Sequence, residues 1–270
     1  MKHVSKNKFL VFVSTLLFTI LILGSFYKKG DEVEVVMNTS KGELILKLYN
    51  ETQDGILSFT ENDNKQYHEI IRFCRELDVE WTASCWDVDS QKFINSLNPD
   101  FQKIASPMNT NHKLIEEACE NGKKIFMSTG MSTRKEISEA LKIINTHGNK
   151  VELMHCNSSY PLDEKNANLA RMIKLRKEFG TDVGYSGHET CLDRICIAAV
   201  VLGATSIERH ITLDRAMYGS DQAASIGVHA LKKLIDGIRL AESYLGSDDI
   251  ESLQRGEEEA HKKLKYYQPA

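Results

Sequence analysis

The sequence contains few prolines and no segment that would divide it into several domains. Only four prolines occur among 270 residues, and no Gly-, Ser- or Pro-rich linker interrupts residues 51–245. A content of 41% apolar and 27% charged residues is ordinary for a soluble globular protein. We therefore expect one sizeable domain in this part of the chain.

The sequence also lacks the basic excess of a nucleic-acid-binding protein and the cysteine pairs of a disulfide-rich one. The formal net charge is −4, and no aromatic-interleaved Lys/Arg stripe occurs, so we expect no nucleic-acid partner. The six cysteines form no CxxC pair. Because four of them stand in apolar strand or helix patterns, we expect buried free thiols, which suit a reducing compartment.

The N-terminus, by contrast, carries a long uncharged run. Residues 9–27, FLVFVSTLLFTILILGSFY, follow the basic MKHVSKNK and are long enough to span a bilayer. We expect an uncleaved membrane anchor within residues 1–28. A signal peptide is the alternative, because the small residues Gly24 and Ser25 follow the apolar core. Positive-inside reasoning would keep the basic end in the cytoplasm and place the remainder across the membrane.

Residues 29–50 form a spacer with a hairpin pattern. Two β-rich runs between Val33 and Tyr49 flank the turn sequence Asn38–Gly42. The sequence of this segment is similar to the opening strands of cyclophilin-type prolyl isomerases, but the similarity does not continue after Asn50. We expect no isomerase activity, and an unrelated β-hairpin is the alternative.

Strand and helix patterns alternate at the spacing of βα units from residue 51 to residue 246. We expect six strands, within residues 79–87, 101–108, 123–131, 150–161, 181–189 and 205–211. The expected helices cover residues 62–77, 90–97, 113–121, 166–179 and 191–202, and one more begins at Thr133, where Glu136 completes a capping box. Continuous apolar runs such as Ile125–Met127 suit strands of a parallel sheet that is buried on both faces.

Polar residues follow the expected strands, as in an α/β barrel whose active site lies at the carboxyl ends of its strands. A doubly wound open sheet is the alternative, but no Gly-rich dinucleotide loop follows any strand. We therefore expect an incomplete (β/α)8 TIM-type barrel with about six of eight βα units. A transmembrane helix and a hairpin would precede it, and a charged helical tail, residues 247–270, would follow.

Two histidines stand just past neighbouring apolar runs and could share one metal ion. These are His188 and His210, with Glu189, Glu208 and Asp221 as nearby carboxylates. Two imidazoles with open coordination positions suit a catalytic divalent ion. For either histidine alone, a core residue bonded to the backbone is the alternative.

Seven motifs in the same region together resemble the sialic acid synthase family, from about Ile56 to Gly246. They are KIAS (103–106), STGM (128–131), HCNSSYP (155–161), NLARM (168–172), GYSGHET (184–190), LGATSIERHITLD (202–214) and GSDQAAS (219–225). The resemblance implies a (β/α)8 barrel that condenses phosphoenolpyruvate with an N-acetylmannosamine-type sugar in nonulosonic acid biosynthesis. Legionaminic or pseudaminic acid precursors are the alternative substrates, and a homodimer is the implied assembly.

The resemblance also assigns roles to single residues. His188 and His210 match the family's metal-binding histidines, with Mn²⁺ as the usual ion and Mg²⁺ as the alternative. Lys103 matches the lysine that grips phosphoenolpyruvate, and a lysine at an apolar strand end would be explained by an anionic ligand. The other matched positions would hold the substrates or orient these groups: Ser106, Ser128 and Ser158 for the phosphate, Tyr160 beside them, Ser84, Asp87 and Asp221 for the sugar, and Glu208 for orienting His210 or a neighbour.

Several positions depart from the family pattern. Ser158 stands where many relatives carry Asn, Gln222 replaces the usual His after Asp221, and Gly187 stands where bacterial members often carry Asp. We find neither the "AEIGxNHxG" glutamate nor the "VKFQ" lysine that complete the phosphoenolpyruvate site on the family's first two strands. We also find no antifreeze-like domain after Gly246. We therefore expect very weak or no synthase activity from this chain.

Two further interpretations stand beside a synthase. One is a non-catalytic membrane-tethered module that keeps only sugar or metal binding. The other is a truncated or chimeric product that never folds. Because phosphoenolpyruvate is a cytosolic metabolite, the family's chemistry would require a cytoplasmic barrel, which conflicts with the topology expected from the basic N-terminus.

Overall fold

The computed structural model describes residues 33–39, 42–48, 61–212, 214–216 and 221–265. The expected membrane anchor, residues 9–27, lies outside these ranges. Among the helices of the described residues, none is long and apolar enough to cross a membrane.

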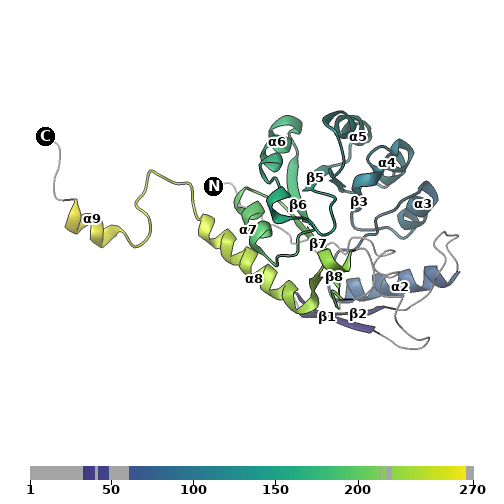
Figure 1. Cartoon of the computed structure of the whole chain (residues 1–270), viewed down its shortest axis with the longest axis horizontal. Helices are drawn as coiled ribbons and strands as arrows, with labels where there is room; N and C mark the ends of the chain where they lie inside the picture. The colour runs from purple at the N-terminus through teal and green to yellow at the C-terminus, as the bar shows by residue number, and fades with distance from the viewer. Residues whose placement is uncertain (1–32, 40–41, 49–60, 213, 217–220, 266–270) are drawn as a thin grey trace.

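The expected hairpin is confirmed. Strand β1 (Val33–Thr39) pairs antiparallel with β2 (Gly42–Leu48), with Thr39 opposite Gly42. Strand β1 lies beside helix α8 (Val228–Leu245), and β2 lies beside helix α2 (Glu61–Glu76), as Figure 1 shows. The hairpin therefore lies against the first and the last long helix of the described chain.

Five parallel strands form the central sheet in simple sequential order. They are β3 (Gln102–Ile104), β4 (Ile125–Ser128), β5 (Val151–Cys156), β6 (Asp182–Gly187) and β7 (Ile207–Arg209). The strand expected at residues 79–87 is reduced to one parallel bridge between Ser84 and Lys103. At the other edge, β8 (Ile211–Thr212) pairs in parallel with β9 (Ile226–Gly227), a strand that the sequence did not indicate. The sheet curls into part of a barrel (Figure 1).

Helices cover the outer face of the curled sheet (Figure 1). Besides α2 and α8 they are α3 (Val88–Ser96), α4 (His112–Cys119), α5 (Arg134–His147), α6 (Ala170–Phe179) and α7 (Arg194–Val201), with short 3-10 turns η1 (Ser106–Met108), η2 (Glu164–Asn166) and η3 (Gln222–Ala224). Helix α6 begins later than expected because Asn168 has a φ of 47°, a left-handed conformation that the interior of a helix excludes. In the expected helical tail, only α9 (Glu258–Leu264) is helical within the described residues.

Residues alternate along each strand between the helix layer and the interior of the curled sheet. One set packs with the helices in the main core: Ile104, Ile125, Met127, Leu153, Val183, Tyr185 and Ile207. The other set begins with a small apolar cluster of Phe101, Phe126 and Met154. Towards the carboxyl ends the same inward positions become polar at Lys103, Ser128, Ser186 and Glu208, with the thiol of Cys156 among them. The strands thus present a polar centre above an apolar base.

The six cysteines are all buried and free, as expected. Cys74 and Cys85 lie in a second apolar cluster with Trp81, formed around α2 and α3. Met108 packs against both this cluster and the main core. The two clusters are therefore in contact.

Candidate active site

A buried ion pair lies at the centre of the site. Lys103 on β3 is only 3% exposed, and its Nζ lies 2.7 Å from Oε2 of Glu208 on β7 and donates to Oγ of Ser128 on β4. Burial is the largest single influence on the pKa of Glu208 and would raise it, but the charge and hydrogen bond of Lys103, together with the neighbouring His210 and His188, hold this pKa below its usual range. Glu208 therefore compensates the charge of Lys103 from within the protein, so the burial of this lysine does not by itself require an anionic ligand.

Ser84 joins this group, whereas Asp87 does not. The hydroxyl of Ser84 donates to the carbonyl oxygen of Lys103 at 3.3 Å, next to the bridge between the two residues. Asp87 is exposed and is the N-cap of α3, where its Oδ1 accepts from the backbone N–H of Ser90 at 2.8 Å. The structure therefore gives Asp87 a capping contact, and its expected position at the sugar stays a prediction.

The two histidines face each other, as the sequence indicated. The ring centroids of His188 and His210 lie 5.1 Å apart at an interplanar angle of 76°. The ring of Tyr160 lies against both, with centroids 4.2 Å from His188 and 5.8 Å from His210. The Nδ1 atom of His210 is 3.2 Å from Oδ2 of Asp221. Three residues assigned to the metal and sugar side are thus brought together, and Tyr160, expected beside the phosphate serines, lies with them.

His188 is held as a neutral ring. Burial, together with the neighbouring His210, lowers its pKa from 6.5 to about 4. Its Nδ1 lies 2.7 Å from the carbonyl oxygen of Asn157. Because a carbonyl only accepts, Nδ1 carries the proton and Nε2 carries the lone pair. This is the tautomer that a metal ligand requires at Nε2.

Two of the three serines predicted for the phosphate, Ser106 and Ser158, cluster around Gly130. Oγ of Ser106 accepts from the backbone N–H of Gly130 at 3.0 Å and lies 3.2 Å from Sγ of Cys156. A side chain at Gly130 would collide with Ser106, Ser158 and Cys156. Burial raises the pKa of Cys156, so this thiol is protonated. The cluster presents two serine hydroxyls and the β4–α5 loop backbone on the Lys103 side of the site.

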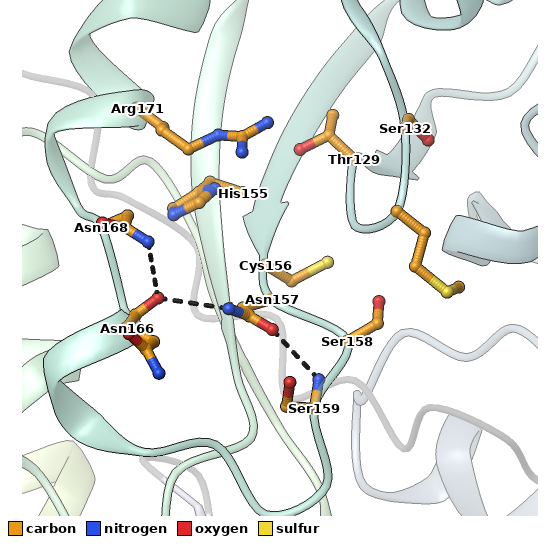
Figure 2. A pocket seen from close by; sticks show the side chains of 11 residues that line it. Thr129, Ser132, His155, Cys156, Asn157, Ser158, Ser159, Asn166, Asn168 and Arg171 are labelled. Carbon is orange, nitrogen blue, oxygen red and sulfur yellow. Dashed lines mark hydrogen bonds between the residues drawn. The ribbon is translucent and has the colours of Figure 1, made fainter.

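A polar cavity of about 310 Å³ opens beside Ser158, between the loops that follow β4 and β5 and the start of α6. Figure 2 shows the side chain of Asn157 among the residues that line it, donating to the carbonyl oxygen of Asn166 at 3.3 Å and accepting from the backbone N–H of Ser159 at 3.1 Å. These two bonds fix Asn157, whose own carbonyl holds His188. The cavity wall therefore braces the histidine site.

Several residues of the site were not indicated by the sequence. Asn157, Cys156 and Gly130 belong to it by contact. Ser186, one of the polar residues expected at the strand ends, pairs with both Cys156 and Glu208 across the sheet. Each stands within one of the seven family motifs. The alternation of side chains along the strands predicts that Cys156 and Ser186 lie on the same face of the sheet as Ser128 and Glu208. Asn157 contacts His188 through its backbone carbonyl oxygen, and no sequence pattern predicts such a contact.

No three His, Cys, Asp or Glu side chains gather into a ready-made metal cluster in the part of the chain that the structure describes. The two facing imidazoles are nevertheless placed so that they could hold a metal ion between them. Water and substrate would have to fill its other positions.

The curled parallel sheet, with its polar centre at the carboxyl ends of the strands, places this chain among the TIM-type α/β barrel proteins. Comparison with known proteins narrows this class. The chain belongs to the NeuB family, whose model matches residues 31–249, a range that includes the β1–β2 hairpin.

Named relatives agree with this family. The human N-acetylneuraminate-9-phosphate synthase is 35% identical over 188 residues, covering 69% of this chain and 52% of the relative. The N,N'-diacetyllegionaminic acid synthase of Campylobacter jejuni is 35% identical over 211 residues, covering 77% of this chain and 63% of the relative. The chain thus spans about half to two thirds of the length of these two relatives.

A solved structure shares the fold. The N-acetylneuraminic acid synthetase of Leptospira borgpetersenii, crystallised with citrate, matches with a TM-score of 0.69 and 28% identity. The match covers 75% of this chain and 72% of that one. The homologues are therefore sialic acid synthases and close relatives of these enzymes.

Proposed function

We propose that this chain binds phosphoenolpyruvate and an N-acetylmannosamine-type sugar and acts in nonulosonic acid biosynthesis. Its relatives support this proposal, since they are named as synthases of N-acetylneuraminate 9-phosphate, N,N'-diacetyllegionaminic acid and pseudaminic acid. Precursors of the last two acids are the alternative sugars.

The observation that carries the proposal is the buried ammonium of Lys103, fixed beside Ser128 and Glu208. Phosphoenolpyruvate brings a phosphate and a carboxylate, and a fixed ammonium with nearby hydroxyl donors suits both groups. The hydroxyls of Ser106 and Ser158 lie on the same side of the site, around Gly130. The phosphate would therefore be held between β3, β4 and β5.

We further propose that His188 and His210 hold a divalent cation, Mn²⁺ in the first place and Mg²⁺ as the alternative. The Asn157 carbonyl fixes the tautomer of His188, and Asp221 lies where it would orient His210. When bound, such a cation would polarise the aldehyde oxygen of the sugar and activate a water molecule.

The proposed reaction joins C3 of phosphoenolpyruvate to the aldehyde carbon of the sugar. Water adds at C2, and inorganic phosphate leaves as C2 becomes a ketone. In this scheme Lys103 would hold the charge of the enol phosphate, while Tyr160 and Asp221, both beside His210, would lie next to the sugar.

Binding of phosphoenolpyruvate tests the site directly. Titration of the chain by calorimetry should show binding that Lys103→Met abolishes. Lys124→Met is the matched control, because Lys124 also pairs with a buried carboxylate, Glu152, but at the opposite end of the sheet. Equal binding by wild type and Lys103→Met would contradict the assignment.

Turnover should be very weak or absent for this chain, because its sequence contains no match to the glutamate and lysine expected on the first two strands. Phosphate release and mass spectrometry of the product, with phosphoenolpyruvate, N-acetylmannosamine and Mn²⁺, would measure it. Turnover near that of an intact synthase would contradict this expectation. The alternative is a non-catalytic sugar- or metal-binding module. It is favoured if the chain binds Mn²⁺, if His188→Ala abolishes that binding, and if no product forms.

A further inference from the structure

A second buried ion pair lies directly behind the two histidines and has no place in the reaction described above. Nη1 of Arg209 is 2.9 Å from Oε1 of Glu189, and the two side chains are 2% and 0% exposed. Glu189 follows His188 in the sequence, and Arg209 precedes His210. The pair therefore links the two chain segments that carry the histidines.

The guanidinium of Arg209 also binds the backbone of the segment that carries His188 and of the turn at Ala224. Its Nη2 donates to the carbonyl oxygen of Glu189 at 2.6 Å and to that of Ala224 at 3.4 Å, and its Nη1 donates to that of Cys191 at 3.1 Å. The backbone N–H of Ala224 in turn donates to the carbonyl of Asp221, the residue that faces His210. One side chain thus ties together the ends of β6 and β7 and the turn before β9.

The carboxylate of Glu189 is fixed from its other side as well. Oε2 accepts from the hydroxyl of Tyr185 at 2.9 Å. A Cβ atom at Gly187 would lie 2.7 Å from both carboxylate oxygens. The carboxylate therefore folds back over Gly187, and a side chain at this position would displace it.

The backbone carbonyls of both histidines are held too. The carbonyl of His188 accepts from the N–H of Leu162, and that of His210 accepts from the N–H of Ile226, both at 2.9 Å. With the backbone fixed, alternation turns His188 and His210 to one side and their neighbours Glu189 and Arg209 to the other. The ion pair is therefore placed to set the spacing of the two rings.

We propose that Glu189 and Arg209 are a positioning pair that fixes the relative placement of the His188 and His210 rings for a shared divalent cation, with Gly187 leaving room for the Glu189 carboxylate. The metal part of this inference rests on the function proposed above, but the placement of the rings does not.

Substitution of Glu189 by Gln tests the proposal, with Mn²⁺ as the probe. The free Mn²⁺ signal in electron paramagnetic resonance gives the affinity of the full chain. We expect Glu189→Gln to weaken binding by about ten-fold or more, the range found when a group supporting a metal ligand is removed. Tyr185→Phe keeps the ion pair but removes one hydrogen bond, so its loss should be smaller. It also provides a milder variant where Glu189→Gln does not fold.

Glu152→Gln is the matched control. Glu152 is also a buried carboxylate, 2% exposed, and accepts from Thr205, Ser206 and Lys124, but it lies at the amino end of β5. Both variants should lower the melting temperature, whereas only Glu189→Gln should weaken Mn²⁺ binding. Wild-type affinity in both Glu189→Gln and Tyr185→Phe, or an equal loss in Glu152→Gln, would overturn the proposal.

A readout without metal separates this inference from the proposed function. The ¹⁵N resonances of the His188 and His210 rings report tautomer and ring environment in the metal-free protein. They should shift in Glu189→Gln and stay unchanged in Glu152→Gln. Absence of Mn²⁺ binding in the wild type would reject the metal assignment, while unchanged ring resonances in Glu189→Gln would reject the positioning role.

Discussion

Lys103 and Glu208 illustrate how a site can be charged and buried without a ligand. The two residues lie 105 positions apart in the sequence and meet only because β3 and β7 curl towards each other. An incoming phosphate or carboxylate would therefore meet an ammonium that already has a carboxylate partner. The anion would share Lys103 with Glu208 unless one contact is broken.

Removal of Lys103 should leave Glu208 as an uncompensated buried charge. We expect Lys103→Met to lower the free energy of unfolding at pH 7 by about 3–5 kcal/mol. The loss should shrink in acid, because the pKa of Glu208 rises without its ammonium and the carboxyl group becomes neutral. Urea denaturation at pH 7 and pH 5 measures both effects. Lys124→Met should cost less, because Lys124 is partly exposed and Glu152 retains two hydroxyl donors.

His188 should make stability depend on pH. Its pKa falls from 6.5 to about 4 on folding, so the unfolded chain binds more protons between these values. Its contribution is therefore complete above about pH 6.5 and is lost as the pH falls towards 4, by on the order of 2–3 kcal/mol. His188→Asn should remove this part of the pH dependence of unfolding. An unchanged pH profile in that variant would contradict the assignment.

The sequence predicted which side chains gather in the site better than it predicted the contacts that each side chain makes. His188, His210 and Asp221 come together as expected, and so do Lys103 and Ser128. Tyr160, expected beside the phosphate serines, lies against the histidines, and Ser84, expected at the sugar, bonds to the backbone of Lys103. The partner of Lys103 was not predicted, because pairing across a curled sheet depends on tertiary register. The N-cap contact of Asp87 was not predicted either, and its place at the sugar stays a prediction.

Helices were predicted more closely than strands. The capping box at the start of α5 was expected and is present, because it depends only on residues three positions apart. Strand 79–87 was expected at full length but pairs only at Ser84, because it stands at the edge of the described sheet and has a neighbour on one side. The two-residue strand β9 is too short to carry a periodic pattern.

The capping box offers a test at the level of the element. Thr133→Ala removes the hydroxyl that accepts from the N–H of Glu136 and should lower the free energy of unfolding by about 1 kcal/mol. Thr146→Ala in the last turn of the same helix is the control, because its exposed hydroxyl only bonds back to the carbonyl of Lys142. Equal melting temperatures for Thr133→Ala and wild type would show that the cap contributes nothing.

The described domain should unfold as one unit. Met108 packs against both apolar clusters, so the α2–α3 cluster around Trp81 and the main core are continuous. In a Trp86→Phe background, which removes the exposed tryptophan, fluorescence reports Trp81 alone. Its thermal transition should coincide with the loss of helical circular dichroism. Two separate transitions would show independent units, and no transition would favour a chain that does not fold.

The close approach of the Glu189 carboxylate to Gly187 makes the effects of substitutions at these two positions non-additive. A side chain introduced at 187 alone should displace the carboxylate and strain the Arg209 contacts, whereas the same change after Glu189 has become small should be tolerated. In a series of single substitutions that replaces both residues, Glu189 should therefore change before Gly187. The order in which neighbouring residues can be exchanged is thus fixed by one contact beneath the histidines.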